Sequence, residues 1–103
     1  MTSQGTAHGR FTRAIARGNL RGAELAAREL GGLSLDDALS LCLLIAERDS
    51  PRFERAALRW LERLIAEKAP TLEDLGGAVM ALMTLRDGQC DGAAESLRRL
   101  ARR

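Results

Sequence analysis

Hydrophobic residues recur at every third or fourth position along most of this chain, which is the spacing of one face of an α-helix. The first run covers residues 10–17 and stops at Gly18. A second run, Leu20–Leu30, follows a potential N-cap at Asn19 and ends before two glycines, which can adopt the left-handed conformation that terminates helices. The pattern therefore predicts a helical hairpin over residues 10–32.

The middle of the chain predicts a second hairpin. Ser34 is a suitable N-cap, and Asp36 and Asp37 follow it where negative charge stabilises the positive end of a helix. The next helix is apolar on nearly every side over residues 39–46, so we expect it to run through the middle of the fold. Proline is compatible with the first helical position, so a fourth and longest helix is expected over residues 51–69.

The fourth helix has two chemically different sides. Its apolar side is formed by Phe53, Ala57, Trp60, Leu61 and Leu64. Arg52, Arg59 and Arg63 cluster on the opposite side. Glu62 and Glu67 follow two of these arginines at the three- and four-residue spacings of intrahelical ion pairs, so a solvated polar side is one interpretation of the cluster. Trp60 is the expected anchor of the core.

The last third of the chain predicts a third hairpin. Thr71, with Asp74 three residues later, resembles a capping box at the start of a helix over Leu72–Arg86, which Gly88 ends. A sixth helix is expected over residues 91–102.

The six helices form three antiparallel hairpins, and a length of 103 residues fits one compact domain. The apolar mass is almost entirely Leu and Ala, with 3% aromatic residues, which suits closely packed helices better than sheets. We therefore predict a single all-α domain over residues 10–103, preceded by a flexible polar tail over residues 1–9.

The hairpins also carry a degenerate internal repeat. Gly, a large residue two positions later and Ala three positions beyond it occur as Gly18, Leu20 and Ala23, and again as Gly88, Cys90 and Ala93. Phe53 and Ala56 take the corresponding positions of the middle hairpin, where Pro51 replaces the glycine. The positions of the large residue lie 33 and 37 residues apart.

A period of about 34 residues with a small residue near the turn resembles the tetratricopeptide repeat family. The resemblance implies a stack of hairpins in which the small residue lets two helices approach closely. The Trp-Leu-Gly-Tyr signature of a full repeat is missing, and a compact helical bundle explains the same residues. Both architectures stay open at this point.

Charge and cysteine usage exclude some classes of protein. The chain has 16 Lys and Arg against 14 Asp and Glu, and the net charge of +2 is too small for strong sequence-independent attraction to nucleic acid or anionic lipid. No apolar run reaches the ~18 residues of a membrane span, and the N-terminus lacks the apolar region of a signal peptide. Cys42 and Cys90 form no CxxC pair. We expect reduced cysteines, a cytoplasmic protein and no membrane contact.

Few residues could perform acid–base or metal chemistry. His8, the only histidine, lies in the expected tail, where we interpret it as a bystander. Cys42 lies in the most apolar helix, where burial raises the pKa of a thiol, and Cys90 lies near a helix start, which could lower it; a structural role is favoured for both. One histidine and two distant cysteines cannot form the usual pairs of metal ligands. The sequence therefore predicts no catalytic residue, no metal site, no cofactor and no enzyme.

Arginines form one candidate surface. Those of the fourth helix and the C-terminal segment make up a candidate basic patch: Arg52, Arg59, Arg63, Arg98, Arg99, Arg102 and Arg103. If the chain ends lie near one another, the C-terminal arginines would be joined by Arg10, Arg13, Arg17 and Arg21. Such a patch could contact phosphates, so a small nucleic-acid-associated regulator is the alternative hypothesis, although the low net charge disfavours it.

Apolar residues form the other candidate surface. The third and fifth helices carry more of them than three hairpins can easily cover, and the candidate partner-binding residues are Leu43, Met80, Leu82 and Met83. Methionine tolerates varied contacts, so uncovered area here favours a groove for a partner helix or a self-association face, while plain core residues are the other interpretation. The leading hypothesis is an interaction or adaptor module that binds a protein partner or a second copy of itself.

Overall fold

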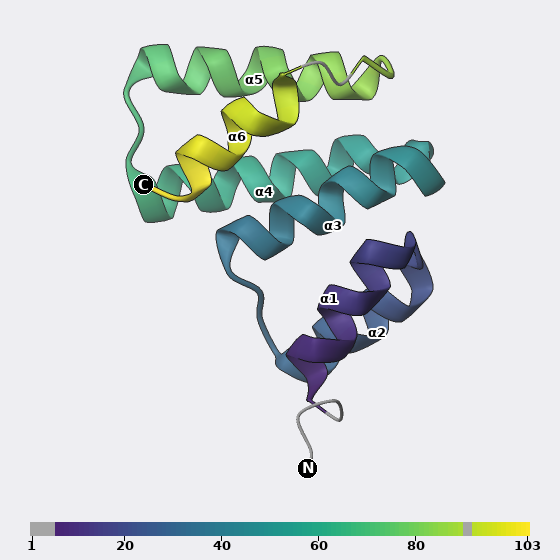
Figure 1. Cartoon of the computed structure of the whole chain (residues 1–103). Coiled ribbons are helices and arrows are strands. Elements are labelled where there is room, and N and C mark those ends of the chain that lie inside the picture. The colour runs from purple at the N-terminus through teal and green to yellow at the C-terminus, as the bar shows by residue number, and fades with distance from the viewer. Residues whose placement is uncertain (1–5, 90–91) are drawn as a thin grey trace.

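The computed structural model describes residues 6–89 and 92–103, and every regular element within them is helical (Figure 1). The elements are α1 (Ala7–Arg17), α2 (Leu20–Leu30), α3 (Leu35–Arg48), the short 3-10 turn η2 (Ser50–Arg52), α4 (Phe53–Lys68), α5 (Leu72–Arg86) and α6 (Ala93–Ala101). The prediction of an all-α fold with six helices is confirmed. Residues 90–91, part of the expected repeat and sixth helix, lie outside the described residues.

The first helix begins earlier than the hydrophobic pattern indicates. α1 starts at Ala7 because Thr6 caps it, and the backbone N–H of Gly9 donates a 3.0 Å hydrogen bond to the Thr6 hydroxyl. The expected flexible tail is therefore wrong for residues 7–9, which form the first turn of the helix. His8 lies on this turn, and its Nε2 is 3.2 Å from Oδ2 of Asp37 on α3.

Side-chain caps set the starts of three other helices. Asn19, Ser34 and Thr71 each accept a 3.0 Å hydrogen bond from the backbone N–H three residues later, as their positions in the sequence predict. Gly18 and Gly31 end the first two helices with φ values of 69° and 76°, a conformation that favours glycine. Local sequence therefore accounts for most helix ends.

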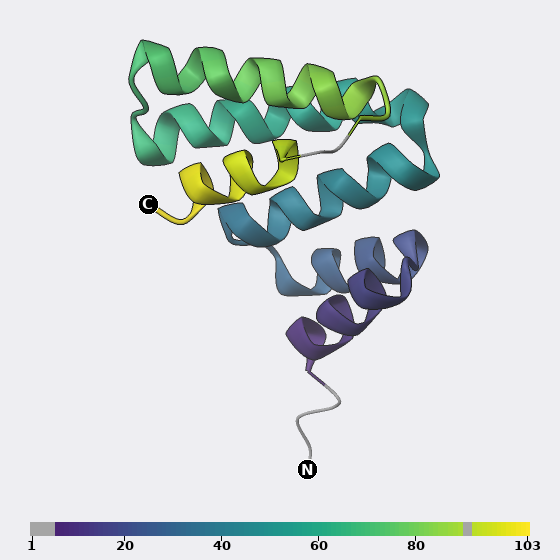
Figure 2. The ribbon, with the colours of Figure 1, turned by 45° about the horizontal axis from the view of Figure 1, so that its top comes forward.

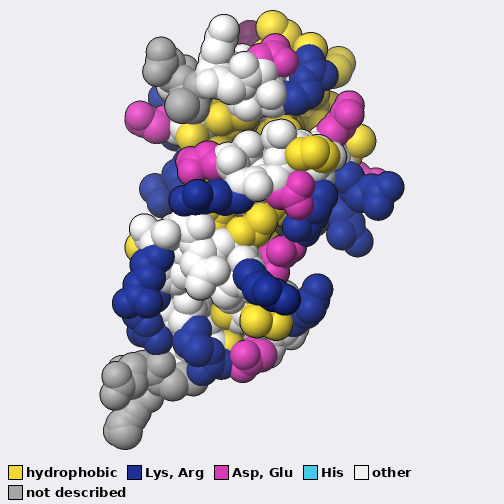
Figure 3. All heavy atoms as spheres, turned by 90° about the vertical axis from the view of Figure 1, so that its right-hand side faces the viewer, with side chains coloured by type: hydrophobic (Ala, Val, Ile, Leu, Met, Phe, Trp, Pro, Cys, Tyr) yellow, Lys and Arg dark blue, Asp and Glu magenta, His cyan; other side chains and the backbone are white. Residues whose placement is uncertain are grey.

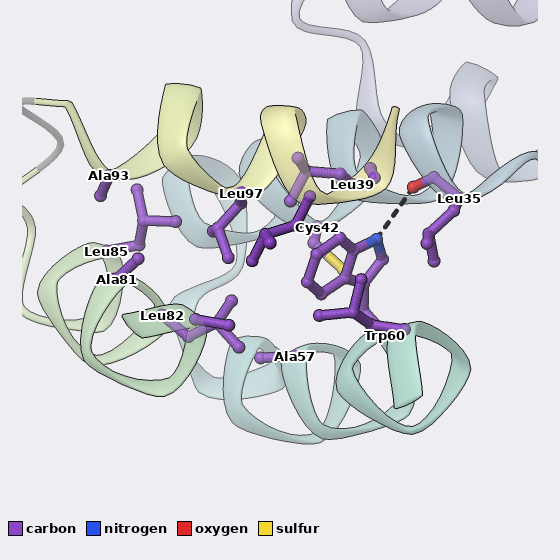
Figure 4. Packing of buried hydrophobic residues seen from close by; sticks show 14 of the residues in the cluster. Leu35, Leu39, Cys42, Ala57, Trp60, Ala81, Leu82, Leu85, Ala93 and Leu97 are labelled. Atoms are coloured by element: carbon purple, nitrogen blue, oxygen red, sulfur yellow. Dashed lines mark hydrogen bonds between the residues drawn. The ribbon is translucent and has the colours of Figure 1, made fainter. Parts of the chain in front are cut away.

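The helix α4 begins at Phe53, two residues later than expected, because Pro51 lies in the η2 turn. Its buried side is narrow and consists of Phe53, Ala57, Trp60 and Leu64, while Leu61, expected in the core, is half-buried. Trp60 is the largest fully buried side chain, and its indole Nε1 donates a 2.9 Å hydrogen bond to the Leu35 carbonyl (Figure 4). The expected role of Trp60 as the core anchor is confirmed.

The helices pair as three consecutive hairpins, and the most extensive contacts join α1 to α2, α3 to α4 and α5 to α6. The helix α3 contacts all five other helices, which confirms that its apolar body runs through the middle of the fold. The molecule is elongated, 45 × 26 × 21 Å, and the α1–α2 hairpin projects beneath the other four helices (Figures 1 and 2). Order and pairing agree with the expected hairpins, and the resemblance to tetratricopeptide repeats stays a prediction.

Two hydrophobic clusters hold these hairpins together. The larger cluster joins α3, α4, α5 and α6 around Trp60 and Leu97 (Figure 4). The smaller cluster fills the α1–α2 hairpin with Phe11 and three alanines, closed by Leu44 of α3. In the part of the chain that the structure describes, no helix has both the length and the apolar character needed to cross a membrane.

Candidate functional site

The helices α4 and α5 leave a row of apolar side chains exposed on one side of their hairpin. We call the α4–α5 face the surface formed by the half-buried Leu61 and the exposed Leu58, Ile65, Leu72, Val79, Met80 and Met83. Leu58 is 57% exposed, Met80 65% and Met83 43%. Single exposed apolar side chains are common on protein surfaces, but a group of adjoining ones is unusual.

The centre of the α4–α5 face is hollowed. A depression of about 250 Å³ lies between the two helices and is lined by Phe53, Ala57, Leu58, Leu61, Val79, Leu82 and Met83. Glu54 and Arg86 complete the lining with one charge of each sign. The face therefore offers a mainly apolar, nearly neutral surface that an apolar side chain of another protein could enter.

The structure separates the four predicted partner-binding residues. Met80 and Met83 are exposed, whereas Leu82 is 7% exposed and belongs to the larger core cluster. Leu43 is half-buried and lines a different hollow, beside residues of α1 and α6. A shared surface of the third and fifth helices was the wrong expectation, because the apolar side chains of α3 are buried or half-buried and the second helix with exposed apolar side chains is α4.

A second surface feature lies on the opposite flank of α4. We call it the arginine groove: an open groove of about 770 Å³ between α2, α3 and α4. Its floor is apolar and consists of Ala38, Leu41, Cys42, Ile45, Pro51, Ala56 and Trp60. Its polar lining is Glu24, Arg52, Arg55, Arg59 and Arg63. On the face shown in Figure 3, Lys and Arg side chains gather along the middle and lower parts, with hydrophobic side chains visible between them.

Two arginines of the groove are paired with acids. Arg52 forms ion pairs with Glu24 across the groove and with Asp49 at 3.2 Å, and hydrogen bonds to these two carboxylates raise the pKa of Arg52. Arg63 forms the expected pair with Glu67 at 2.8 Å. These contacts hold the two ends of the arginine row in place.

The other two arginines, Arg55 and Arg59, are exposed and form no ion pair within the described residues. The Arg59–Glu62 pair that the sequence suggested is not formed. Arg55 was missed in the sequence analysis, although its position three residues after Arg52 and four before Arg59 places it on the same side of the helix. The groove therefore contains two guanidinium groups available to a ligand.

The C-terminal arginines do not extend this row. Arg98 and Arg102 pair with Asp36 of α3 at 2.8 and 3.1 Å, and Arg103 pairs with Asp74 of α5 at 2.5 Å. Within the described residues, the guanidinium of Arg99 donates a hydrogen bond only to the hydroxyl of Ser96, at 3.4 Å. The single basic patch of seven arginines is therefore wrong, because three of them neutralise acids that tie α6 to its neighbours.

These ion pairs shift the pKa of both acids. Burial tends to raise the pKa of Asp36, but hydrogen bonds from Arg98 and Arg102 outweigh it, so that pKa lies below its usual value. The hydrogen bond from Arg103 lowers the pKa of Asp74 in the same direction. Both carboxylates are thus held in the charged form that attaches α6.

One hollow in the described part of the chain brings an N-terminal arginine and a C-terminal arginine together. Arg17 and Arg98 line a common hollow of about 400 Å³, together with Arg48 and Glu47. Arg98, however, directs its guanidinium to Asp36 and to the hydroxyl of Ser40, and Arg10 pairs with Glu29. The combined patch of both chain ends is therefore only partly formed.

The reactive side chains singled out in the sequence occupy unremarkable positions. Burial raises the pKa of the Cys42 thiol to about 11, and its Sγ lies 3.5 Å from the carbonyl of Ala56 beneath the groove. Cys90 lies outside the described residues. Among the described residues, no group of three His, Cys, Asp or Glu side chains is arranged to hold a metal ion.

Comparison with protein-family models, with curated proteins and with solved structures yields no match to this chain. The two surfaces on the flanks of α4 are therefore interpreted from their own chemistry.

Proposed function

We propose that this chain is a cytoplasmic helical module that binds protein, and that the α4–α5 face is its main contact surface. The observation that supports the proposal is the exposed row of leucine, isoleucine, valine and methionine side chains beside a core that is already filled by Trp60, Leu64 and Leu97. Full burial of one such side chain contributes roughly 1.5–3 kcal/mol, so several of them favour association once the entropic cost of binding is met.

We take a second copy of the same chain as the partner, because self-association requires no other protein. The α4–α5 face carries Glu54 and Arg86 at the same end of the hairpin, beside the apolar hollow. In a two-fold symmetric pair in which equivalent ends meet, Glu54 of one copy lies across from Arg86 of the other. The face is then self-complementary in charge as well as apolar in its centre.

Sedimentation velocity tests this proposal. The wild-type chain is expected to form dimers as its concentration rises from micromolar to millimolar, and the double variant Leu58→Glu/Met83→Glu is expected to stay monomeric because both glutamates would be desolvated at the interface. Leu25→Glu is the matched control, since Leu25 is 52% exposed on α2 and lies away from the face.

The self-association proposal fails if the wild-type chain is monomeric at millimolar concentration. It also fails if Leu25→Glu abolishes the dimer as effectively as the double variant, because the contact would then lie elsewhere on the molecule. Circular dichroism of each variant checks that the helices are retained.

A further inference from the structure

We propose that the arginine groove binds an acidic peptide segment that also carries apolar side chains. The groove is distinct from the α4–α5 face, since the two hollows share no lining residue, and the proposal does not depend on self-association. Three features support it: the spacing of the arginines, the charge of the two arginines that form no ion pair, and the apolar floor between α3 and α4.

The arginines stand in a row along one flank of α4. Arg55, Arg59 and Arg63 follow one another at four-residue intervals, so each lies about 6 Å further along the helix axis than the one before. A helical peptide that places carboxylates at every fourth position has the same spacing. Arg55 and Arg59 can then each meet a carboxylate in the two-pronged arrangement that arginine favours.

The charge of the groove is not satisfied within the described part of the chain. Four arginines line it against one glutamate, Glu24, which is already bound to Arg52. Arg55 and Arg59 lack an acidic partner among the described residues. They lie between Arg52 and Arg63, and ion pairs hold those two side chains in position. An acidic ligand supplies the missing partners without breaking any existing ion pair.

The floor favours a peptide over a ligand that offers charge alone. Ala38 and Leu41 of α3 and Ala56 of α4 are half-buried and line the groove beside the arginine row. A phosphate backbone would contact the arginines and leave this apolar floor in water. A leucine or similar side chain on the acidic peptide covers the floor and adds roughly 1 kcal/mol or more from its partial burial.

Fluorescence anisotropy provides the direct test. The probe is a dye-labelled helical peptide of Glu, Leu and Ala, with Glu at every fourth position and Leu on the adjacent face. We expect it to bind the wild-type chain at low salt and to weaken as salt rises. The same peptide with Gln in place of Glu is expected to lose this binding, because it offers no charge to the two unpaired arginines.

The variant Arg55→Gln/Arg59→Gln is expected to weaken peptide binding by about tenfold or more, since two charge-assisted contacts are removed. Arg17→Gln/Arg99→Gln is the matched control: it lowers the net charge by the same amount, and neither arginine lines the groove. All four side chains are exposed, so neither double variant removes core packing.

A second readout places the peptide in the groove. Trp60 is the only tryptophan, so the protein has one indole N–H signal in a ¹⁵N spectrum. Because Trp60 lines the groove floor, this signal is expected to shift on addition of the Glu peptide and to stay unchanged with the Gln peptide.

Three results would overturn the proposal. One is the absence of binding to the Glu peptide at low salt. Another is an equal loss of affinity in the two double variants, which would show attraction by net charge rather than by the groove. The third is tighter binding of duplex DNA than of the Glu peptide with the same dependence on Arg55 and Arg59, which would assign the groove to nucleic acid.

Discussion

One helix of this molecule separates two surfaces with opposite chemistry. On one flank of α4, Leu58, Leu61 and Ile65 join side chains of α5 in an apolar, nearly neutral face. On the other flank, Arg55 and Arg59 stand over a groove that α2 and α3 complete. The buried side of α4 consists of only four residues, Phe53, Ala57, Trp60 and Leu64, and it supports both surfaces.

The helix α4 therefore has three sides rather than the two expected of an amphipathic helix. Periodicity assigns α4 a core side and a solvent side. The solvent side has two parts with different residues, because different helices lie beside each part. Beside α5 the exposed positions are apolar, and beside α2 and α3 they are arginines. Damage to the buried side of α4 should therefore abolish both self-association and peptide binding. A change on one flank should affect only the binding activity of that flank.

The largest effect is expected from the shared support. Trp60→Ala removes the largest buried side chain and its hydrogen bond to the Leu35 carbonyl. We expect it to lower the free energy of unfolding by about 3–5 kcal/mol and to abolish both association and peptide binding. Urea unfolding followed by circular dichroism measures this change, and full retention of either binding activity would show that the two flanks do not depend on a common core.

The next effect is confined to the apolar flank. Val79→Glu/Met83→Glu, in which both changes lie on α5, is expected to weaken self-association by at least about tenfold while it changes peptide binding in the arginine groove by less than about twofold. Anisotropy of the acidic peptide and sedimentation of the same sample measure the two quantities. Parallel losses of both activities would mean that the flanks are coupled.

A smaller effect is expected from a change at Asp36, the acid that forms ion pairs with two C-terminal arginines. Asp36→Asn removes the carboxylate that binds Arg98 and Arg102, and we expect a loss of about 1 kcal/mol of unfolding free energy at pH 7. Peptide binding in the arginine groove should stay the same, because neither arginine lines it. A loss of peptide affinity would show that the C-terminal arginines belong to the site.

The same pair defines a pH dependence. Because the folded-state pKa of Asp36 lies below its usual value near 3.8, its contribution is fully present above that value and is lost as the pH falls through the lowered pKa. The stability difference between wild type and Asp36→Asn should therefore be constant near neutral pH and shrink under acid conditions. A difference that grows on acidification would contradict the assignment. Urea unfolding at several pH values measures it.

The smallest effect concerns one end of the arginine row. Glu67→Gln removes the partner of Arg63, which costs about 0.3–0.5 kcal/mol of helix stability and frees a third guanidinium for the ligand. Affinity for the acidic peptide is expected to rise by about twofold. Thermal unfolding and anisotropy measure the two changes, and a fall in affinity would indicate that Glu67 orients Arg63 for binding.

Local patterns in the sequence predict most of the fold. The bounds of α2 and α5 agree with the expected runs because their caps, Asn19 and Thr71, act within three residues of themselves. The start of α1 was missed because Thr6 precedes a stretch with no apolar pattern. Such errors are confined to helix ends.

The composition of the two surfaces was less predictable, because it depends on how helices that are distant in the sequence pack against one another. Periodicity shows that Leu58 and Ile65 share a side of α4, but only the placement of α5 shows that this side is open. The pairing of Asp36 with Arg98 joins residues 62 positions apart, which no local rule can find. The expected patch of arginines was divided for the same reason.

The methionines of the α4–α5 face allow a direct test of whether this face is a contact surface. The chain has three methionines, two of which, Met80 and Met83, lie exposed on this face. With ¹³C-methyl-labelled methionine, we expect the Met80 and Met83 methyl signals to shift with protein concentration in the wild type and to stay constant in Leu58→Glu/Ile65→Glu. Signals that stay constant over the whole concentration range in the wild type would contradict it.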